Sequence, residues 1–195
     1  MAYSPGTAPT TIAPIAPIQT VSGNQAKMMR IAEAATRTFK QGAVVVVTIG
    51  YVNESAAIQL DTTQIAGFAT EAAHNQTAAG TPGPGLTYGS VPNQASAKII
   101  AVGSPPEDGC CGVDVACEDT LFVGYTNTEA VLAVTDRGAK AGLTKDGTSG
   151  FWFVDRNQTV AFGLVVEIVE LLDAVGTSGG RVIFKVNKAN QQLAV

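Results

Sequence analysis

The 195-residue chain carries a net charge of −4, with 46% hydrophobic and only 14% charged residues. Because a typical soluble domain has roughly 25% charged residues, this composition favours a chain that buries surface in an assembly. No Lys/Arg-rich run is available to neutralise phosphates, which argues against nucleic-acid binding. No apolar stretch reaches the ~18 residues that span a bilayer, and no secretory signal is evident, so we expect no membrane partner and synthesis in the cytoplasm.

Residues 1–25 are rich in Pro, Thr and Ala and predict an extended N-terminal arm. Ile12, Ile15 and Ile18 recur at every third position, with Pro14 and Pro17 between them. A polyproline conformation has about three residues per turn and would place the three isoleucines on one edge. The alternatives are a disordered tail and an arm that orders on a neighbouring subunit. We favour the second, with these five residues making the contact.

The first half of the chain shows several short β-branched runs. We expect a turn at 51–55, and in the last run before residue 70 Gly67 marks close packing or a bulge. The predicted strands of this half are 27–31, 43–49, 57–60, 65–69 and 97–102. The run at 43–49 is apolar throughout, which predicts burial on both faces.

Two long loops are expected at 71–94 and 103–119, one on either side of the predicted strand 97–102. The only histidine, His74, lies in the first loop. A catalytic histidine requires a positioned nucleophile–base pair, and no such motif accompanies it. The sequence therefore predicts a solvated loop histidine.

The second loop holds all the cysteines, Cys110, Cys111 and Cys117. Their spacing differs from the paired Cys-x2-Cys ligands of zinc sites, and free, packed thiols are expected in a reducing cytoplasm. A bridge from Cys117 to Cys110 or Cys111 stays open as the alternative. Five acids flank the cysteines without the spacing of an EF-hand loop, so a solvated acidic loop is expected and a calcium site is the weaker alternative. These acids are Glu107, Asp108, Asp114, Glu118 and Asp119.

From Leu121 to Lys185, short apolar runs alternate with turns. Lys145-Asp146-Gly147 before the run at 151–154 predicts a hairpin, because Asp and Gly tolerate positive φ. Neighbouring strand residues point to opposite faces, so Trp152 should lie on one face and Phe151 on the other, one being core and the other an interface. Trp152 is expected to be a packing anchor. Further strands are expected at 164–172, with a bulge or a helical piece left open, and at 181–186.

Short strands at this spacing favour an all-β barrel or sandwich. We expect one β domain at 26–187 with long loops at 71–94 and 103–119, and a loose tail at 188–195. Neither a phosphate-binding loop nor a catalytic motif is present in the sequence, so neither enzymatic activity nor a cofactor or metal site is expected.

The order of these features resembles that of the decoration (cement) proteins of tailed-bacteriophage capsids. The match begins with the Pro/Thr-rich arm, continues with the strand entry at 38–45 and the Ile-Ala-Gly-Phe-Ala segment at 65–69, and ends with a motif series over 136–185. The matching positions of that series are Asp136, Gly138, Lys140, Gly142, Leu143, Lys145, Trp152, Val154, Asp155, Val166, Ile168, Val169, Leu171, Asp173, Val175, Gly176, Gly180, Arg181, Val182 and Phe184. The insertion at 103–119 departs from the family pattern.

This resemblance implies a structural, β-tulip-type virion protein that binds the outer surface of a phage head. It implies homotrimers that bridge neighbouring major capsid subunits and stabilise the capsid, without enzymatic activity. The expected localisation is the capsid surface of the virion. Two alternatives stay open: another virion β protein of a tail, fibre or adaptor, and a β barrel that binds a small ligand.

Overall fold

The computed structural model describes residues 5–20, 26–56, 60, 64–75, 109–129, 131–158 and 163–193. Within these ranges the chain forms β-strands and short 3₁₀ turns, with no α-helix and no helix long or apolar enough to cross a membrane. The strands are β1 (Ala16–Thr20), β2 (Met28–Ala32), β3 (Val44–Thr48), β4 (Tyr51–Glu54), β5 (Gly67–Ala69), β6 (Cys110–Val115), β7 (Thr120–Tyr125), β8 (Lys140–Lys145), β9 (Trp152–Asp155), β10 (Val166–Leu171) and β11 (Arg181–Val186).

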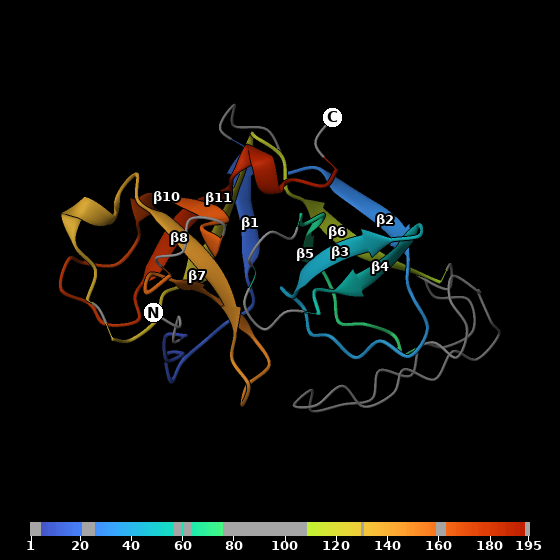
Figure 1. Ribbon diagram of the computed structural model, residues 1–195, viewed down its shortest axis with the longest axis horizontal. Coiled ribbons are helices and arrows are strands. Elements are labelled where there is room, and N and C mark those ends of the chain that lie inside the picture. Colours follow the sequence, from blue (N-terminus) through green and yellow to red (C-terminus); the bar gives the residue numbers. More distant parts are fainter. Residues whose placement is uncertain are drawn as a thin grey trace.

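The strands form two antiparallel sheets that lie next to one another (Figure 1). Sheet A has six strands in the order β1-β7-β11-β10-β8-β9, and sheet B has five in the order β2-β6-β5-β3-β4. Sheet A therefore contains the C-terminal strands together with the N-terminal β1, whereas sheet B contains the strands between them. The all-β, sandwich-like class expected from the sequence is confirmed.

Both sheets contribute to one hydrophobic core. At its centre the ring of Phe68 from β5 lies 4.4 Å from that of Phe122 on β7 and 5.9 Å from that of Phe184 on β11. Aromatic rings at such distances pack favourably in tilted and edge-to-face arrangements. Since Phe68 belongs to sheet B and the other two rings to sheet A, the sheets are joined by shared core side chains.

Sheet A follows the sequence closely. The hairpin expected around Asp146-Gly147 is formed by β8 and β9, with Lys145 opposite Trp152, although its turn runs from 146 to 151. Strand β10 carries a register shift between Ile168 and Glu170, which identifies the irregularity in this run as a bulge.

Strand β9 differs from the expectation in one respect. Trp152 and Phe153 are each only 1% exposed, and Val154 and Asp155 are also buried. The interpretation of one face as core and the other as an interface was therefore wrong, because this chain covers both faces. The Trp152 indole Nε1 donates a hydrogen bond to Glu54 Oε1 on β4 at 3.0 Å, so Trp152 packs between the two sheets.

Sheet B corrects two expectations. Residues 51–54, predicted as a turn, form β4, and β6 lies in the expected loop 103–119, between β2 and β5. Gly67 confirms the prediction of close packing, because a Cβ there would lie 2.0 Å from the Asp114 carbonyl oxygen of β6. The expected strand 97–102 and most of 57–60 lie outside the described residues.

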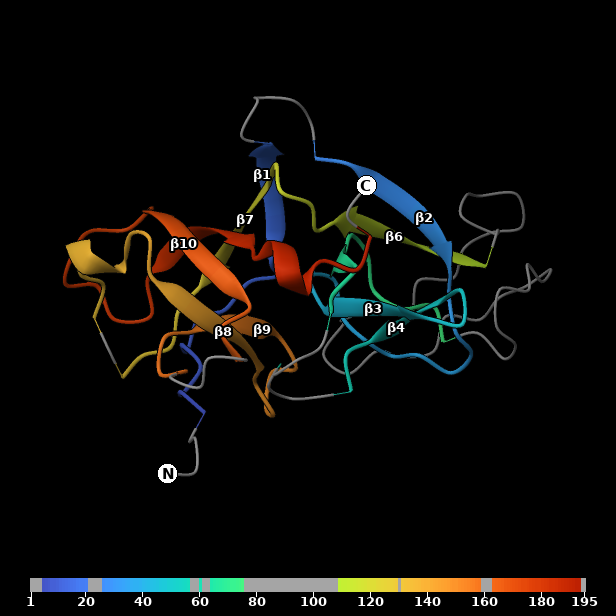
Figure 2. The ribbon, with the colours of Figure 1, turned by 45° about the horizontal axis from the view of Figure 1, so that its top comes forward.

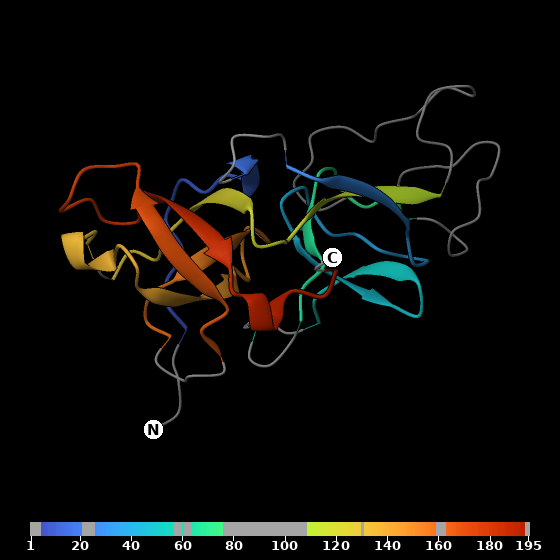
Figure 3. The same cartoon turned by 90° about the horizontal axis from the view of Figure 1, so that it is seen from above.

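The C-terminal tail expected at 188–195 is held in place over its described part, 188–193. After the 3₁₀ turn η3 (Lys188–Asn190), which lies between the two sheets (Figure 3), Gln191 is buried. The Gln192 side chain pairs with the backbone of Val47 on β3, accepting from its N–H and donating to its carbonyl, each at 2.7 Å. A side-chain amide that mimics a strand partner fixes this segment, which its polar composition alone does not reveal.

Candidate functional site

The residues that the sequence predicts as interaction sites lie in the N-terminal segment. Ile15 is 2% exposed and belongs to this chain's own core, whereas Ile18 is 44% exposed. Ile12, Pro14 and Pro17 are partly buried. The three isoleucines do not share one exposed edge, because the chain enters β1 and positions three apart in an extended strand point to opposite faces.

The arm packs on sheet A of the same chain. Strand β1 pairs with β7 at the sheet edge (Figure 2), and further upstream the Gly6 N–H donates to Asp155 Oδ2 at 2.9 Å. The Thr128 N–H donates to the carbonyl of Thr7 at 3.0 Å. Within the described arm, Ile18 is therefore the large apolar side chain most available to another molecule.

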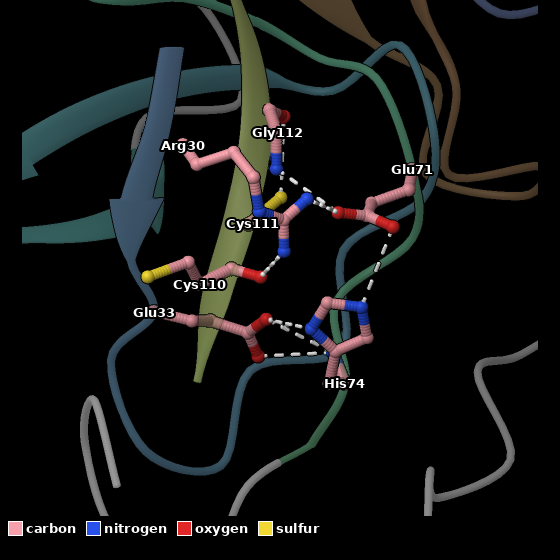
Figure 4. Close-up of polar contacts among 7 residues, drawn as sticks. All are labelled: Arg30, Glu33, Glu71, His74, Cys110, Cys111 and Gly112. Atoms are coloured by element: carbon pink, nitrogen blue, oxygen red, sulfur yellow. Dashed lines mark hydrogen bonds and ion pairs between the residues drawn. The ribbon is translucent and has the colours of Figure 1, made fainter. Parts of the chain in front are cut away.

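His74 is buried rather than solvated, being 4% exposed, which corrects the sequence expectation. Its Nδ1 lies 2.8 Å from Glu33 Oε2, and its Nε2 lies 3.6 Å from Glu71 Oε2 (Figure 4). Its backbone N–H also donates to Glu33 Oε1 at 3.0 Å. Glu33 itself is completely buried at the end of β2.

Arg30 extends this group of charges toward β6. Its Nη1 donates to Glu71 Oε1 at 3.1 Å and its Nη2 to the Cys110 carbonyl at 2.8 Å (Figure 4). Glu71 Oε1 also accepts the Gly112 N–H at 3.0 Å. We call Arg30, Glu33, Glu71 and His74 the His74 cluster.

The electrostatics of the cluster favour a charged histidine. Burial alone lowers the pKa of His74, but hydrogen bonds and charge attraction from Glu33 and Glu71 outweigh it and raise the pKa to about 9. Burial opposes ionisation of Glu71, yet hydrogen bonds from His74 and Gly112 and the charges of His74 and Arg30 lower its pKa. With His74 protonated, two cations face two carboxylates, which is how buried charges are tolerated.

The cluster is not arranged for nucleophilic catalysis. Burial raises the pKa of the neighbouring Cys111 thiol far above its ordinary value, and the negative charges of Glu71 and Glu33 raise it further. A reactive cysteine needs the opposite environment, one that lowers its pKa. Both ring nitrogens of His74 face carboxylates, so the imidazole is committed to ion pairs.

The His74 cluster instead joins residues on either side of the segment 76–108, which lies outside the described ranges. Glu71 and His74 precede that segment, and the Glu33 N–H donates to the carbonyl of Gly109, which follows it, at 2.8 Å. The three-residue spacing of Glu71 and His74 in the sequence was only a weak indication that their side chains would pair. Nothing in the sequence pairs Glu33 with a histidine 41 positions away.

None of the three cysteines is joined in a disulfide, in agreement with the expected thiols. Cys111 is buried, and Cys117 Sγ lies 2.9 Å from Thr120 Oγ1. Among the described residues no group of three or more His, Cys, Asp or Glu side chains is placed to hold a metal ion. Glu107 and Asp108 lie outside the described ranges.

Comparisons with protein families, with curated proteins and with solved structures found no match.

Proposed function

We propose that the protein is a structural virion protein that binds the outer surface of a phage head and stabilises it by bridging major capsid subunits as a homotrimer. The observation that carries this proposal is the ordered motif series over 136–185, which resembles that of capsid decoration proteins.

The places of the polar motif residues support a framework role. Asp136 accepts a hydrogen bond from Arg156 Nη2 at 2.6 Å and from the Ala133 N–H at 2.7 Å. The buried Asp155 accepts from Thr144 Oγ1 at 3.0 Å. Asp173 pairs with Arg181 across the loop between β10 and β11 at 2.7 Å. These carboxylates stabilise turns and neighbouring strands of sheet A, which supports a role as a scaffold that presents a surface.

The edge strands offer a surface for a partner. Strand β1 is at the edge of sheet A and β2 at the edge of sheet B (Figure 2). They expose Ile18, Met28 and Met29 at 44%, 57% and 36%. Unpaired strand edges accept strands or loops of other chains, and apolar side chains beside them add favourable burial. We propose these edges as the capsid-facing surface.

Binding to purified heads tests this assignment. Deleting residues 1–20 would also remove Ile15 from the core, so point variants are the better probe. Ile18→Asp and Met28→Asp should reduce occupancy on heads at least tenfold, because each places a charge in the interface. Val131→Asp, at a position that is 52% exposed and lies far along the chain from both edges, is the matched control.

Occupancy that stays unchanged in both edge variants would contradict the capsid-facing surface. Copy number separates the main alternatives: hundreds of copies per particle support a decoration protein, and a handful would support a tail, fibre or adaptor component.

A further inference from the structure

A groove lies where the segment 36–40, the end of β4 and the turn after β8 meet. It consists of two adjoining hollows of about 300 Å³ and about 380 Å³. The hollows share Thr38, Phe39, Glu54 and Lys145. Because Ser55 lines the first of them, we call this the Ser55 groove.

Ser55 carries a hydroxyl with no hydrogen-bond partner in the described structure. The residue is only 8% exposed, and its Oγ is buried without a donor or acceptor beside it. Burying an unpaired hydroxyl is unfavourable, so such groups are rare without a reason. A hydroxyl can donate to a bound oxygen, and Ser55 is one of the residues that line a hollow of the size of a small polar ligand.

The charges of the groove point to an anion. Three basic side chains line it, those of Arg37, Lys40 and Lys145. Both carboxylate oxygens of Glu54 are already engaged, one by Trp152 Nε1 at 3.0 Å and the other by Lys145 Nζ at 2.7 Å. Asp146, the other acidic residue of the lining, accepts the Ser149 N–H at 2.6 Å.

Arg37 is exposed, and among the described residues no hydrogen bond or ion pair engages its guanidinium. Burial lowers the pKa of Lys40 and the nearby ammonium of Lys145 lowers it further, while the carboxylate of Asp146 opposes both in part. Like charges held close together destabilise one another, and an anion between them removes that penalty. The groove thus carries excess positive charge in a chain whose net charge is −4.

We propose that the Ser55 groove binds an oxyanion, a carboxylate or a phosphate group. Arg37 and Lys145 supply the charge and Ser55 Oγ supplies a hydrogen bond. The guanidinium suits this task, because its planar fork matches the two oxygens of a carboxylate or phosphate. This assignment does not depend on the proposed role in the virion.

Trp152 provides a built-in reporter of binding. It is the only tryptophan in the chain, and its indole N–H is bonded to the carboxylate that also holds Lys145. An anion that draws Lys145 toward it changes the charge balance at Glu54. The single indole N–H resonance in a ¹H–¹⁵N spectrum therefore senses the occupancy of the groove.

The experiment titrates the full-length ¹⁵N-labelled protein at constant ionic strength with two probes, inorganic phosphate and a blocked Glu-Glu dipeptide. Chloride at matched ionic strength is the blank. We expect a saturable shift of the indole resonance. Saturation by phosphate alone identifies a free oxyanion as the ligand, whereas tighter binding of the dipeptide identifies a carboxylate of a protein segment.

Matched variants test the residues. Arg37→Gln should weaken binding about tenfold or more, since hydrogen bonds to charged groups are the stronger class. Arg137→Gln removes an exposed arginine outside the groove and should leave binding unchanged. Ser55→Ala should weaken binding about threefold to tenfold while the melting temperature of the free protein stays equal or rises, because an unpaired buried hydroxyl is removed.

A resonance that responds to neither probe beyond the chloride blank would overturn the proposal. So would equal affinities of the Arg37→Gln and Arg137→Gln proteins. A Ser55→Ala protein that melts lower and binds normally would assign Ser55 a structural role and remove it from the site.

Discussion

The polar contacts within sheet A differ in kind from those within sheet B. Sheet A is closed by short-range turns: Asp146 within the β8–β9 turn and Asp173 with Arg181 between β10 and β11. Sheet B depends on the His74 cluster, which joins β2, the segment after β5 and β6 through charges far apart in sequence. The carboxylates at the turns of sheet A therefore pair with residues close in sequence, whereas those of sheet B form long-range pairs that include a buried, titratable histidine.

The largest change in the free energy of unfolding is expected in the core that sheets A and B share. Phe68→Ala removes the ring that contacts both Phe122 and Phe184, and it should lower the free energy of unfolding by about 3–5 kcal/mol. Denaturation followed by Trp152 fluorescence and by far-UV circular dichroism should give coincident transitions in the wild-type protein. Separate transitions would show that the sheets unfold independently, contrary to a shared core. Val175→Ala, at a residue that is 57% exposed, should change the free energy of unfolding by less than about 0.5 kcal/mol.

Substitutions in the His74 cluster should give the next largest loss in the free energy of unfolding. Glu33→Gln keeps the side-chain shape but leaves the buried cation of His74 without its closest partner, which should cost about 3 kcal/mol. The matched change in sheet A is Glu167→Gln, whose partner Lys185 lies 3.4 Å away at a partly exposed site. That change should cost less than about 1 kcal/mol. Equal losses in the two variants would remove the distinction between the two sheets.

The pH dependence follows from the same cluster. Because the folded-state pKa of His74 is raised from 6.5 to about 9, its contribution is fully present below pH 6.5 and is lost as the pH rises through 9. One pKa unit corresponds to 1.36 kcal/mol, so the rise from 6.5 to about 9 corresponds to a loss on the order of 3 kcal/mol. Chemical denaturation between pH 6 and 10 measures it.

His74→Gln is the control for this dependence, since Lys40, whose pKa is lowered, also titrates at alkaline pH. The variant should be less stable at pH 6 and should lose most of the slope between pH 6.5 and 9. A slope that persists in full would assign the dependence to other groups.

The smallest effect concerns the turn between β3 and β4. Ile49 and Gly50 connect these strands with φ of 52° and 83°, and Ile49 is 92% exposed. A β-branched residue is strained at positive φ, whereas Asn-Gly is the favoured pair for such a turn. Ile49→Asn should therefore raise the free energy of unfolding by about 1 kcal/mol, as measured by urea denaturation. A loss of stability would show that Ile49 makes contacts that outweigh the strain.

The sequence predicted sheet A better than sheet B for reasons visible in single residues. An apolar run directly after Gly179-Gly180 predicted β11 at its observed bounds, Arg181–Val186. In sheet B, Ile49-Gly50 lacks the Asn or Asp that signals a hairpin, so β4 was predicted as a turn. Cysteines and glycines among acids concealed β6, although Gly112 is required there because a Cβ would lie 2.2 Å from Thr70 Oγ1.

The interaction residues of the arm were predicted from isoleucines at every third position. That spacing places side chains on one edge in a polyproline conformation but not in a β-strand. Once β1 pairs with β7, Ile15 enters the core and Ile18 faces outward. The prediction of a solvated His74 was wrong because its partner Glu33 is distant in sequence and is brought near only by the pairing of β2 with β6. Trp152 was predicted as a packing anchor, and it is buried between the sheets.

Imaging of virions that contain this chain by electron cryomicroscopy tests the central proposal most directly. The account predicts density for this fold on the outer head surface, in trimers at local threefold positions, with β1 and β2 and the side chains of Ile18 and Met28 against the major capsid subunits. Density for the fold in the tail, or a head surface without it, would contradict the proposal.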